Sequence, residues 1–141
     1  MDQKNTLVSP CGIYCADCPA YKAKDDPVMM RKMLTYGFPK ESLPCPGCRP
    51  LKGKCPVIGG SCETYDCFEK KNITFCYECK EFPCSRFEPT ADKAAAAMQN
   101  TKCFNLCYIQ KHGLGKWLEN TVEIKKRYFQ GKLVYGKGPV L

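Results

Sequence analysis

Five cysteines crowd the stretch from residue 62 to residue 84, CETYDCFEKKNITFCYECKEFPC, spaced C-x4-C, C-x8-C, C-x2-C and C-x4-C. Almost no aliphatic side chain lies between them. A segment that buries little apolar surface does not offset the conformational entropy lost on folding, so it needs another source of stability. We therefore expect bound metal, held by the sulfur atoms, to stabilise this part of the chain.

The cysteine count must be interpreted together with the cellular compartment. The N-terminal segment MDQKNTLVSP has no apolar core of a signal peptide, and no run of about 18 apolar residues predicts a membrane span. We expect a cytoplasmic protein with no membrane association. In that reducing compartment, 13 cysteines, an odd number, favour metal-bound thiolates over disulfides.

The formal net charge of +8 counts every cysteine as neutral. Two ions, each held by four thiolates, would lower it to roughly +4, and three to roughly +2. Basic residues that lie among the cysteines can offset this thiolate charge, namely Arg49, Lys52, Lys54, Lys70, Lys71, Lys80 and Arg86. The basic excess is therefore only weak support for a nucleic-acid partner.

Three cysteine pairs have the C-x2-C spacing of metal-binding knuckles: Cys15 with Cys18, Cys45 with Cys48, and Cys76 with Cys79. Two intervening residues let a tight turn point both sulfurs at one ion about 2.3 Å away, while backbone N–H groups donate to the sulfurs. Because the chain has one histidine, we expect all-sulfur sites with four ligands each.

One pairing that satisfies tetrahedral coordination joins the first two knuckles, Cys15, Cys18, Cys45 and Cys48. A second ion would take Cys76, Cys79, Cys84 and either Cys67 or Cys62, and Cys11 would join a third site or cap a neighbour. Cys55 has no obvious partner. Structural zinc contributes about 10 to 16 kcal/mol, against about 5 to 15 kcal/mol for the stability of a typical domain, so metal would decide whether the region folds.

Other chemistries use similar spacings. An iron-sulfur cluster is the main alternative, because all-cysteine ligation serves both zinc and iron. Cys11, Cys15 and Cys18 share the C-x3-C-x2-C spacing of radical S-adenosylmethionine enzymes, but those enzymes resemble partial barrels and this chain lacks repeated strand-helix units. A thioredoxin-like redox pair needs a βαβ context that the proline-rich surroundings do not offer.

Signals for catalysis are weak, and the sequence leans against an enzyme without deciding the question. No nucleophile elbow, phosphate loop or H-E-x-x-H motif is present. A water-bearing zinc site would need a base, for which Glu63, Glu78 or Glu81 qualifies only by proximity. We favour helix packing over metal binding for Cys103 and Cys107, which are four residues apart, and a helix-end position for His112.

The pattern of apolar residues and helix signals predicts a small α+β, α-rich protein with irregular, metal-stabilised, zinc-knuckle-like loops. We expect a cysteine-rich region at 1–89 and a helical region at 90–141 packed on it. Asp26 and Pro27 begin a helix at about 27–36, with Val28, Met30, Met33 and Leu34 at helical spacing. Further helices are expected at about 91–100, through Phe104, Cys107, Tyr108 and Ile109 to an end near His112, and at about 114–129. The tail after Gly131 forms a strand or lies extended.

At CGIYCADCPAY, CPGC, CETYDC and CYECKEFPC the chain resembles a family of short cysteine-rich prokaryotic and archaeal proteins, domain of unknown function 3795. The resemblance covers about residues 9–88 and implies a zinc-binding module without an established activity. It implies metal-ligand roles for Cys11, Cys15, Cys18, Cys45, Cys48, Cys62, Cys67, Cys76, Cys79 and Cys84. Cys55, Cys103 and Cys107 are additional to the pattern.

These observations favour a zinc protein with two or three four-cysteine sites that acts as an interaction module for another protein. The runner-up is an iron-sulfur protein that carries electrons or supports a partner enzyme. A third hypothesis is a nucleic-acid binder that uses the knuckles and the basic face at 125–127, and its binding would weaken steeply with salt.

Overall fold

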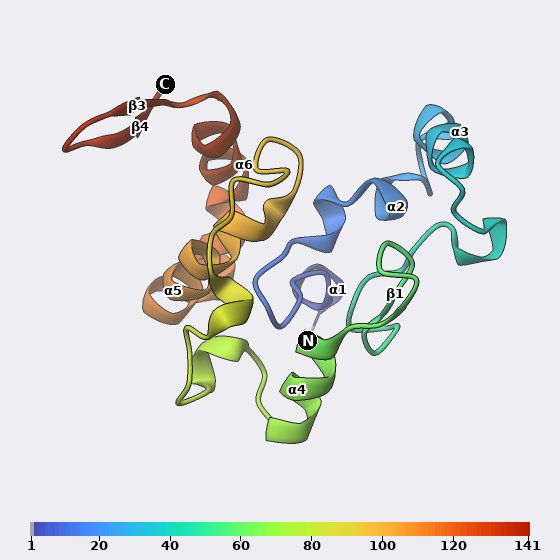
Figure 1. Cartoon of the computed structure of the whole chain (residues 1–141), viewed down its shortest axis with the longest axis horizontal. Coiled ribbons are helices and arrows are strands. Elements are labelled where there is room, and N and C mark those ends of the chain that lie inside the picture. The colour runs from blue at the N-terminus through green and yellow to red at the C-terminus, as the bar shows by residue number, and fades with distance from the viewer. Residues whose placement is uncertain (1) are drawn as a thin grey trace. The chain divides into compact units, whose positions relative to one another are not determined.

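The computed structural model describes residues 2–141, which form a first compact unit that ends at Phe82 and a second one, Pro83–Leu141 (Figure 1). Each unit combines helices with a short two-stranded antiparallel hairpin and irregular loops. The predicted fold class, a small α-rich α+β protein with irregular cysteine-rich loops and a helical C-terminal region, is confirmed. The boundary lies a few residues before the division at 89 that we expected from composition.

The first unit consists mostly of short elements joined by turns. Its α-helices are α1 (Gln3–Thr6), α2 (Pro19–Lys22), α3 (Pro27–Thr35) and α4 (Glu63–Lys71). Strand β1 (Lys54–Cys55) pairs antiparallel with β2 (Gly60–Ser61). Turns of 3₁₀ helix lie at Cys15–Asp17, Lys40–Ser42 and Cys76–Glu78.

Helix α3 has the bounds and the cap that the sequence predicts. Its N-cap, Asp26, accepts hydrogen bonds from the backbone N–H groups of Val28 and Met29, and Pro27 occupies the first turn. Met33 is buried as expected. The apolar stripe was predicted only in part, because Val28 is 64% exposed and Leu34 is 38% exposed.

Helix α4 lies within the segment that the sequence analysis treated as irregular, so its existence was missed. It has a detectable charge signal, with Glu63 and Asp66 in its first turn and Lys70 and Lys71 in its last turn. These charges complement the helix macrodipole. Asn72 ends the helix in the left-handed conformation, with φ of 51°.

The first unit has a small core in which sulfur atoms replace some of the usual aliphatic groups. Ala20, Met33 and Cys45 form a buried cluster, against which Met29 and Phe38 pack. Other buried side chains of this unit are Leu7, Val8, Cys15, Ala23, Tyr65, Phe75 and Cys76. Thiols are therefore both core components and candidate ligands here.

The second unit is built on two adjacent helices, α5 (Lys102–His112) and α6 (Leu114–Gln130), joined at Gly113. Both were predicted with nearly these bounds. Leu106 and Ile109 of α5 and Trp117 and Ile124 of α6 are buried. The Trp117 indole N–H donates to the side-chain oxygen of Asn105 over 3.2 Å, which satisfies a polar group inside this core.

The alanine-rich segment after Thr90 does not form the predicted helix. Residues 91–97 are turns followed by the 3₁₀ turn Met98–Thr101, and Lys93 adopts a positive φ of 54°. The Asn100 side chain pairs with the backbone N–H and C=O of Thr90, and the Gln99 amide donates to the C=O groups of Arg86 and Glu88. These tertiary hydrogen bonds override the high helix propensity of alanine.

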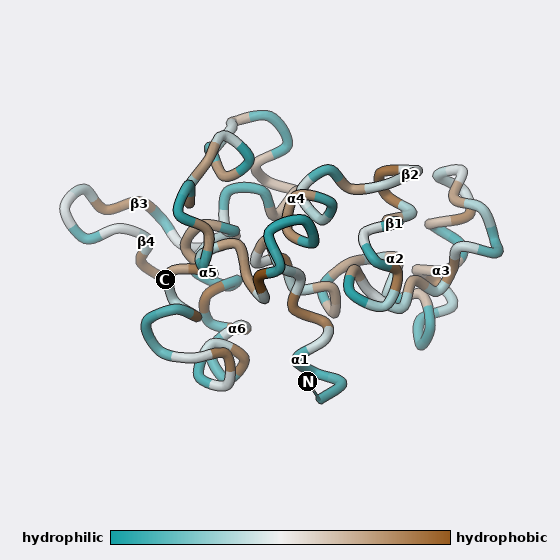
Figure 2. Tube along the Cα trace, turned by 90° about the horizontal axis from the view of Figure 1, so that it is seen from below, coloured by the Kyte–Doolittle hydropathy of each residue, from teal (hydrophilic) through white to brown (hydrophobic). Residues whose placement is uncertain are grey.

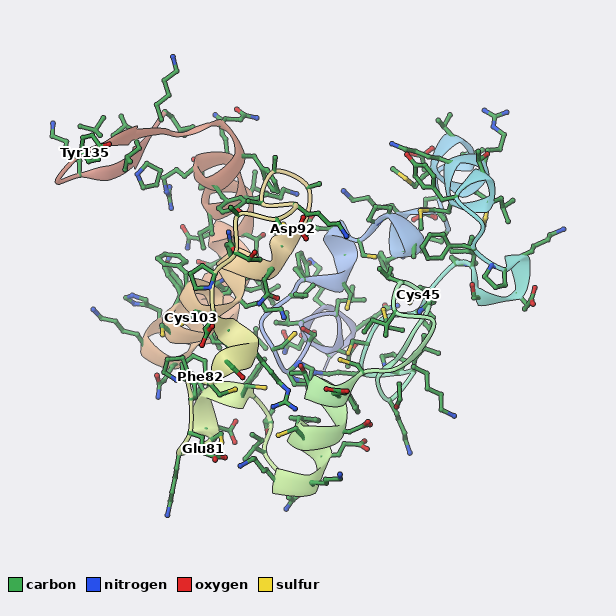
Figure 3. All side chains as sticks on the ribbon, in the orientation of Figure 1. Cys45, Glu81, Phe82, Asp92, Cys103 and Tyr135 are labelled. Atoms are coloured by element: carbon green, nitrogen blue, oxygen red, sulfur yellow. The ribbon has the colours of Figure 1, made fainter. Side chains whose placement is uncertain are left out.

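The tail forms a hairpin of β3 (Lys132–Val134) and β4 (Gly138–Val140), with Tyr135 exposed at its turn (Figure 3). This outcome agrees with the strand alternative for the tail. Hydrophobic stretches along the chain are short (Figure 2). Among the described residues, no helix combines the length and apolar character needed to cross a bilayer.

Gly53, which follows the knuckle of Cys45 and Cys48, packs closely against Tyr65 of α4. Replacement of Gly53 tests this contact. A Cβ at Gly53 would lie 2.5 Å from the Cβ of Tyr65, and φ is +76°. We expect Gly53→Ala to lower the free energy of unfolding by about 2 to 5 kcal/mol, from overpacking and backbone strain together. Urea unfolding followed by circular dichroism measures the loss.

Gly59→Ala is the matched control for this prediction. Gly59 has a similar φ of +74°, but an added Cβ would meet nothing within 4 Å. Its replacement should cost only the backbone strain, about 1 to 2 kcal/mol. Equal losses at the two positions would contradict a packing role for the approach of Gly53 to Tyr65.

Candidate metal centre

Two of the three predicted knuckles adopt the same local structure. The backbone N–H of Cys18 donates to the C=O of Cys15 over 3.0 Å, and that of Cys79 donates to the C=O of Cys76 over 3.1 Å. Both turns are 3₁₀ helices that begin at the first cysteine. Each knuckle is therefore a tight turn, as the spacing predicts.

The remaining knuckle, Cys45 with Cys48, contacts the knuckle of Cys15 and Cys18 through Cys48. The backbone N–H of Cys48 donates to the Sγ of Cys15 over 3.4 Å, although the two residues are 33 positions apart. Burial raises the pKa of the Cys15 thiol to about 11, and the neighbouring thiols of Cys18, Cys45 and Cys11 add to that rise. A backbone donor aimed at a buried sulfur is the arrangement that stabilises a metal-bound thiolate.

Cys48 lies among several other thiols of the first unit. Burial raises its pKa, and the negative charges of ionised Cys15, Cys11, Cys62 and Cys55 raise it further, in that order. Cys11 is fixed locally, because its Sγ contacts the hydroxyl of Ser9 at 3.1 Å and that hydroxyl accepts from the N–H of Ile13. The structure thus brings Cys11, Cys15 and Cys48 into one neighbourhood.

Cys45 has a partly different set of neighbours. Burial raises its pKa, a backbone N–H donated by Gly47 lowers it, and the charges of Cys18 and Cys55 raise it. Cys55, which has no obvious partner in the sequence, therefore acts electrostatically on both cysteines of the CPGC knuckle.

The remaining predicted ligands occupy different elements. Cys67 is half-buried within α4, Cys76 is buried, and Cys84 precedes the 3₁₀ turn Ser85–Phe87 of the second unit. The N–H of Cys76 donates to the C=O of Pro10, next to Cys11. Within residues 2–141, no group of three or more His, Cys, Asp or Glu side chains is arranged to hold a metal ion, and the predicted ligand sets stay predictions.

Arg49, directly after Cys48, joins separate segments of the first unit. Its Nε donates to the C=O of Val8 and a terminal guanidinium nitrogen donates to the C=O of Thr74, each over 2.8 Å. The guanidinium lies over the rings of Phe68 and Phe75, with its carbon 5.6 and 5.0 Å from the ring centroids. The sequence analysis assigned Arg49 only a charge-balancing role and missed this bridging role.

The charge of Arg49 is also placed to favour thiolates. Burial lowers the pKa of the guanidinium, while Tyr65 and the thiols of Cys48, Cys15 and Cys11, when ionised, act in the opposite direction. The same electrostatic attraction stabilises thiolate anions beside the guanidinium. Arg49 thus offsets the charge of the most crowded thiols.

Lys71 has a similar position at the CYEC knuckle. Its ammonium group forms an ion pair with Glu81, and hydrogen bonds to Glu81 and then to Cys79 raise its pKa. Glu81 in turn donates its backbone N–H to the Sγ of Cys79 over 3.4 Å. A cation and a backbone donor therefore both face this sulfur.

The carboxylates that we considered as catalytic bases have structural roles. Glu78 accepts hydrogen bonds from the backbone N–H groups of Thr74 and Phe75, over 3.1 and 3.0 Å. Glu81 pairs with Lys71, and Glu63 lies in the first turn of α4. These contacts account for the acidic residues beside the cysteines without a reaction.

Replacement of Arg49 tests its bridging role. We expect Arg49→Ala to lower the free energy of unfolding by about 2 to 4 kcal/mol, because two carbonyls lose a charged donor and two rings lose a stacked cation. Urea unfolding at constant metal content measures this change. Arg49→Lys keeps the charge without the planar fork, so it should recover only part of the loss.

An Arg49→Ala loss below about 1 kcal/mol, typical of an isolated surface contact, would contradict this prediction.

Comparison with known proteins assigns the family. The family model described as protein of unknown function (DUF3795) matches residues 7–89, more than half of the chain. This range contains all ten predicted metal ligands.

The chain therefore belongs to this family, and the resemblance seen in the cysteine clusters is confirmed. No curated protein and no solved structure matches the chain.

Proposed function

We propose that this protein binds zinc through cysteine thiolates of its first unit and that the metal stabilises this unit as an interaction module for another protein. The observation that carries the proposal is the hydrogen bond from the backbone N–H of Cys48 to the Sγ of Cys15, which joins two separate knuckle segments next to the guanidinium of Arg49. Cys11 and Cys62 are further candidate ligands, because their charges also raise the pKa of the Cys48 thiol.

The donor set fits a structural zinc ion. The available side chains are thiols, and backbone N–H groups already donate to the sulfurs of Cys15 and Cys79. Four thiolates on a divalent ion leave a net charge of about −2, which Arg49 partly offsets.

An interaction role fits a closed metal site in which the neighbouring carboxylates Glu78 and Glu81 are engaged in structural contacts. A closed site with four sulfur ligands leaves no position for a reacting water. Such an ion fixes loops, and the fixed loops present a surface to a partner.

Metal analysis of one matched pair of variants tests the proposal. Protein purified without oxygen should contain zinc at a stoichiometry of one or more, and Cys48→Ser should lose about one equivalent, because an alcohol is a poor zinc ligand. Cys107→Ser, which removes an exposed thiol of the second unit, should keep the full content. Elemental analysis by mass spectrometry gives the values.

Two results would contradict the zinc assignment. Unchanged zinc content in Cys48→Ser would remove this thiol from the ligand set. Coloured protein with iron and acid-labile sulfide would replace the proposal by the iron-sulfur alternative.

Zinc removal should affect the two units differently. We expect a chelator to lower hydrogen-exchange protection around Cys15 and Cys48 by on the order of 100-fold or more, because structural zinc supplies much of the folding free energy. Amides of α5 and α6 should keep most of their protection, because Leu106, Ile109 and Trp117 form an apolar core there. Equal loss in both units would contradict a local structural role for the metal.

A further inference from the structure

Cys103 and Cys107 of α5 form a second kind of thiol site, outside the first unit. They are four residues apart, so they lie on one face of the helix, with Cα atoms about 6 Å apart in regular helix geometry. The sequence analysis favoured a packing role for both. The structure corrects this for Cys107, which is exposed, whereas Cys103 is half-buried and the buried residues of α5 are Asn105, Leu106 and Ile109.

The two thiols interact directly with each other. Burial raises the pKa of Cys103, and the charge of Cys107 and a side-chain hydrogen bond between the two sulfurs raise it further. The i, i+4 spacing therefore places two interacting thiols on one face of α5, and Cys107 is exposed to solvent. Core packing explains neither the exposure of Cys107 nor the sulfur-sulfur contact.

The surroundings of the pair restrict which ligand it can bind. Helix α5, KCFNLCYIQKH, has no acidic residue, and Lys102 and Lys111 flank the cysteines in the sequence. Hard cations prefer oxygen ligands, carboxylates above all, and α5 has no carboxylate, while a structural zinc ion needs four ligands. A soft centre that is satisfied by two sulfurs, and that does not add positive charge, matches the site better.

We propose that Cys103 and Cys107 form a two-thiol site for soft thiophilic species such as trivalent arsenicals, separate from the cysteines of the first unit. In the reaction with an organoarsenic(III) oxide, two As–S bonds form and the bonds between arsenic and oxygen break. The two thiol protons leave with that oxygen as one water molecule. Arsenic stays trivalent and no oxidant or reductant is consumed.

The sequence around the pair allows an unambiguous test in the full-length, zinc-loaded protein. Trypsin cleavage after Lys102 and Lys111 releases residues 103–111, CFNLCYIQK, which contain these two cysteines and no others. We would add phenylarsine oxide in increasing amounts, alkylate the remaining thiols with N-ethylmaleimide, digest and record peptide masses. The first equivalent should appear on this peptide as one bridging arsenic without alkylation.

Variants separate a two-thiol site from simple thiol reactivity. Cys103→Ser and Cys107→Ser should each raise the arsenical concentration needed for half-saturation by about 100-fold, because the second bond is no longer intramolecular. The double variant Cys107→Ser, Gln110→Cys keeps two thiols on the same peptide but separates them by about 10 Å along the helix. It should behave like the single variants.

Each other result would overturn the proposal. The first equivalent of arsenical could bind cysteines of the first unit, or the respaced variant could bind the arsenical as tightly as the unchanged protein. Peptide 103–111 could also be two hydrogens lighter than expected, because its two cysteines already form a disulfide. Unchanged circular dichroism at 222 nm checks that the variants keep α5. Zinc content should stay constant in all of them, so failure here is distinct from failure of the zinc proposal.

Discussion

The contacts of Arg49 are the interaction on which the first unit most depends. This unit has few aliphatic side chains, and its segments are too short to be stable alone. One guanidinium reaches the carbonyls of Val8 and Thr74 and lies over two aromatic rings. It thereby links Val8, before the knuckle of Cys15 and Cys18, to Thr74, before the knuckle of Cys76 and Cys79. Cys48 lies next to Arg49 in the sequence. These contacts lie beside the hydrogen bond that joins the N–H of Cys48 to the sulfur of Cys15.

Local signals in the sequence were sufficient for the elements that depend on local interactions. Asp26 and Pro27 specify the start of α3, and apolar periodicity specifies α5 and α6. The sequence failed where distant groups decide the conformation. Side chains of Gln99 and Asn100 unwind an alanine-rich segment that propensity assigns to a helix, and α4 was missed because its charges were read as solvated loop residues.

The sequence predicts which cysteines form knuckles, but it does not predict which knuckles lie next to each other. Spacing identifies knuckles because a turn is local, and the structure shows two of them as the same 3₁₀ turn. Which knuckles meet depends on contacts across tens of residues, such as the N–H of Cys48 with the sulfur of Cys15. For the same reason, sequence spacing gave no indication that Cys55 lies near Cys45.

The close approach of Gly53 to Tyr65 also limits how the chain length can vary between relatives. Because the backbone touches the side chain there, the path from Cys48 to Gly53 has a fixed length. The exposed turn at Val57, Ile58 and Gly59, by contrast, meets no packed neighbour around its glycine. Insertions and deletions in this region should therefore accumulate at the tip of the β1–β2 hairpin, where a longer loop leaves the thiols in place.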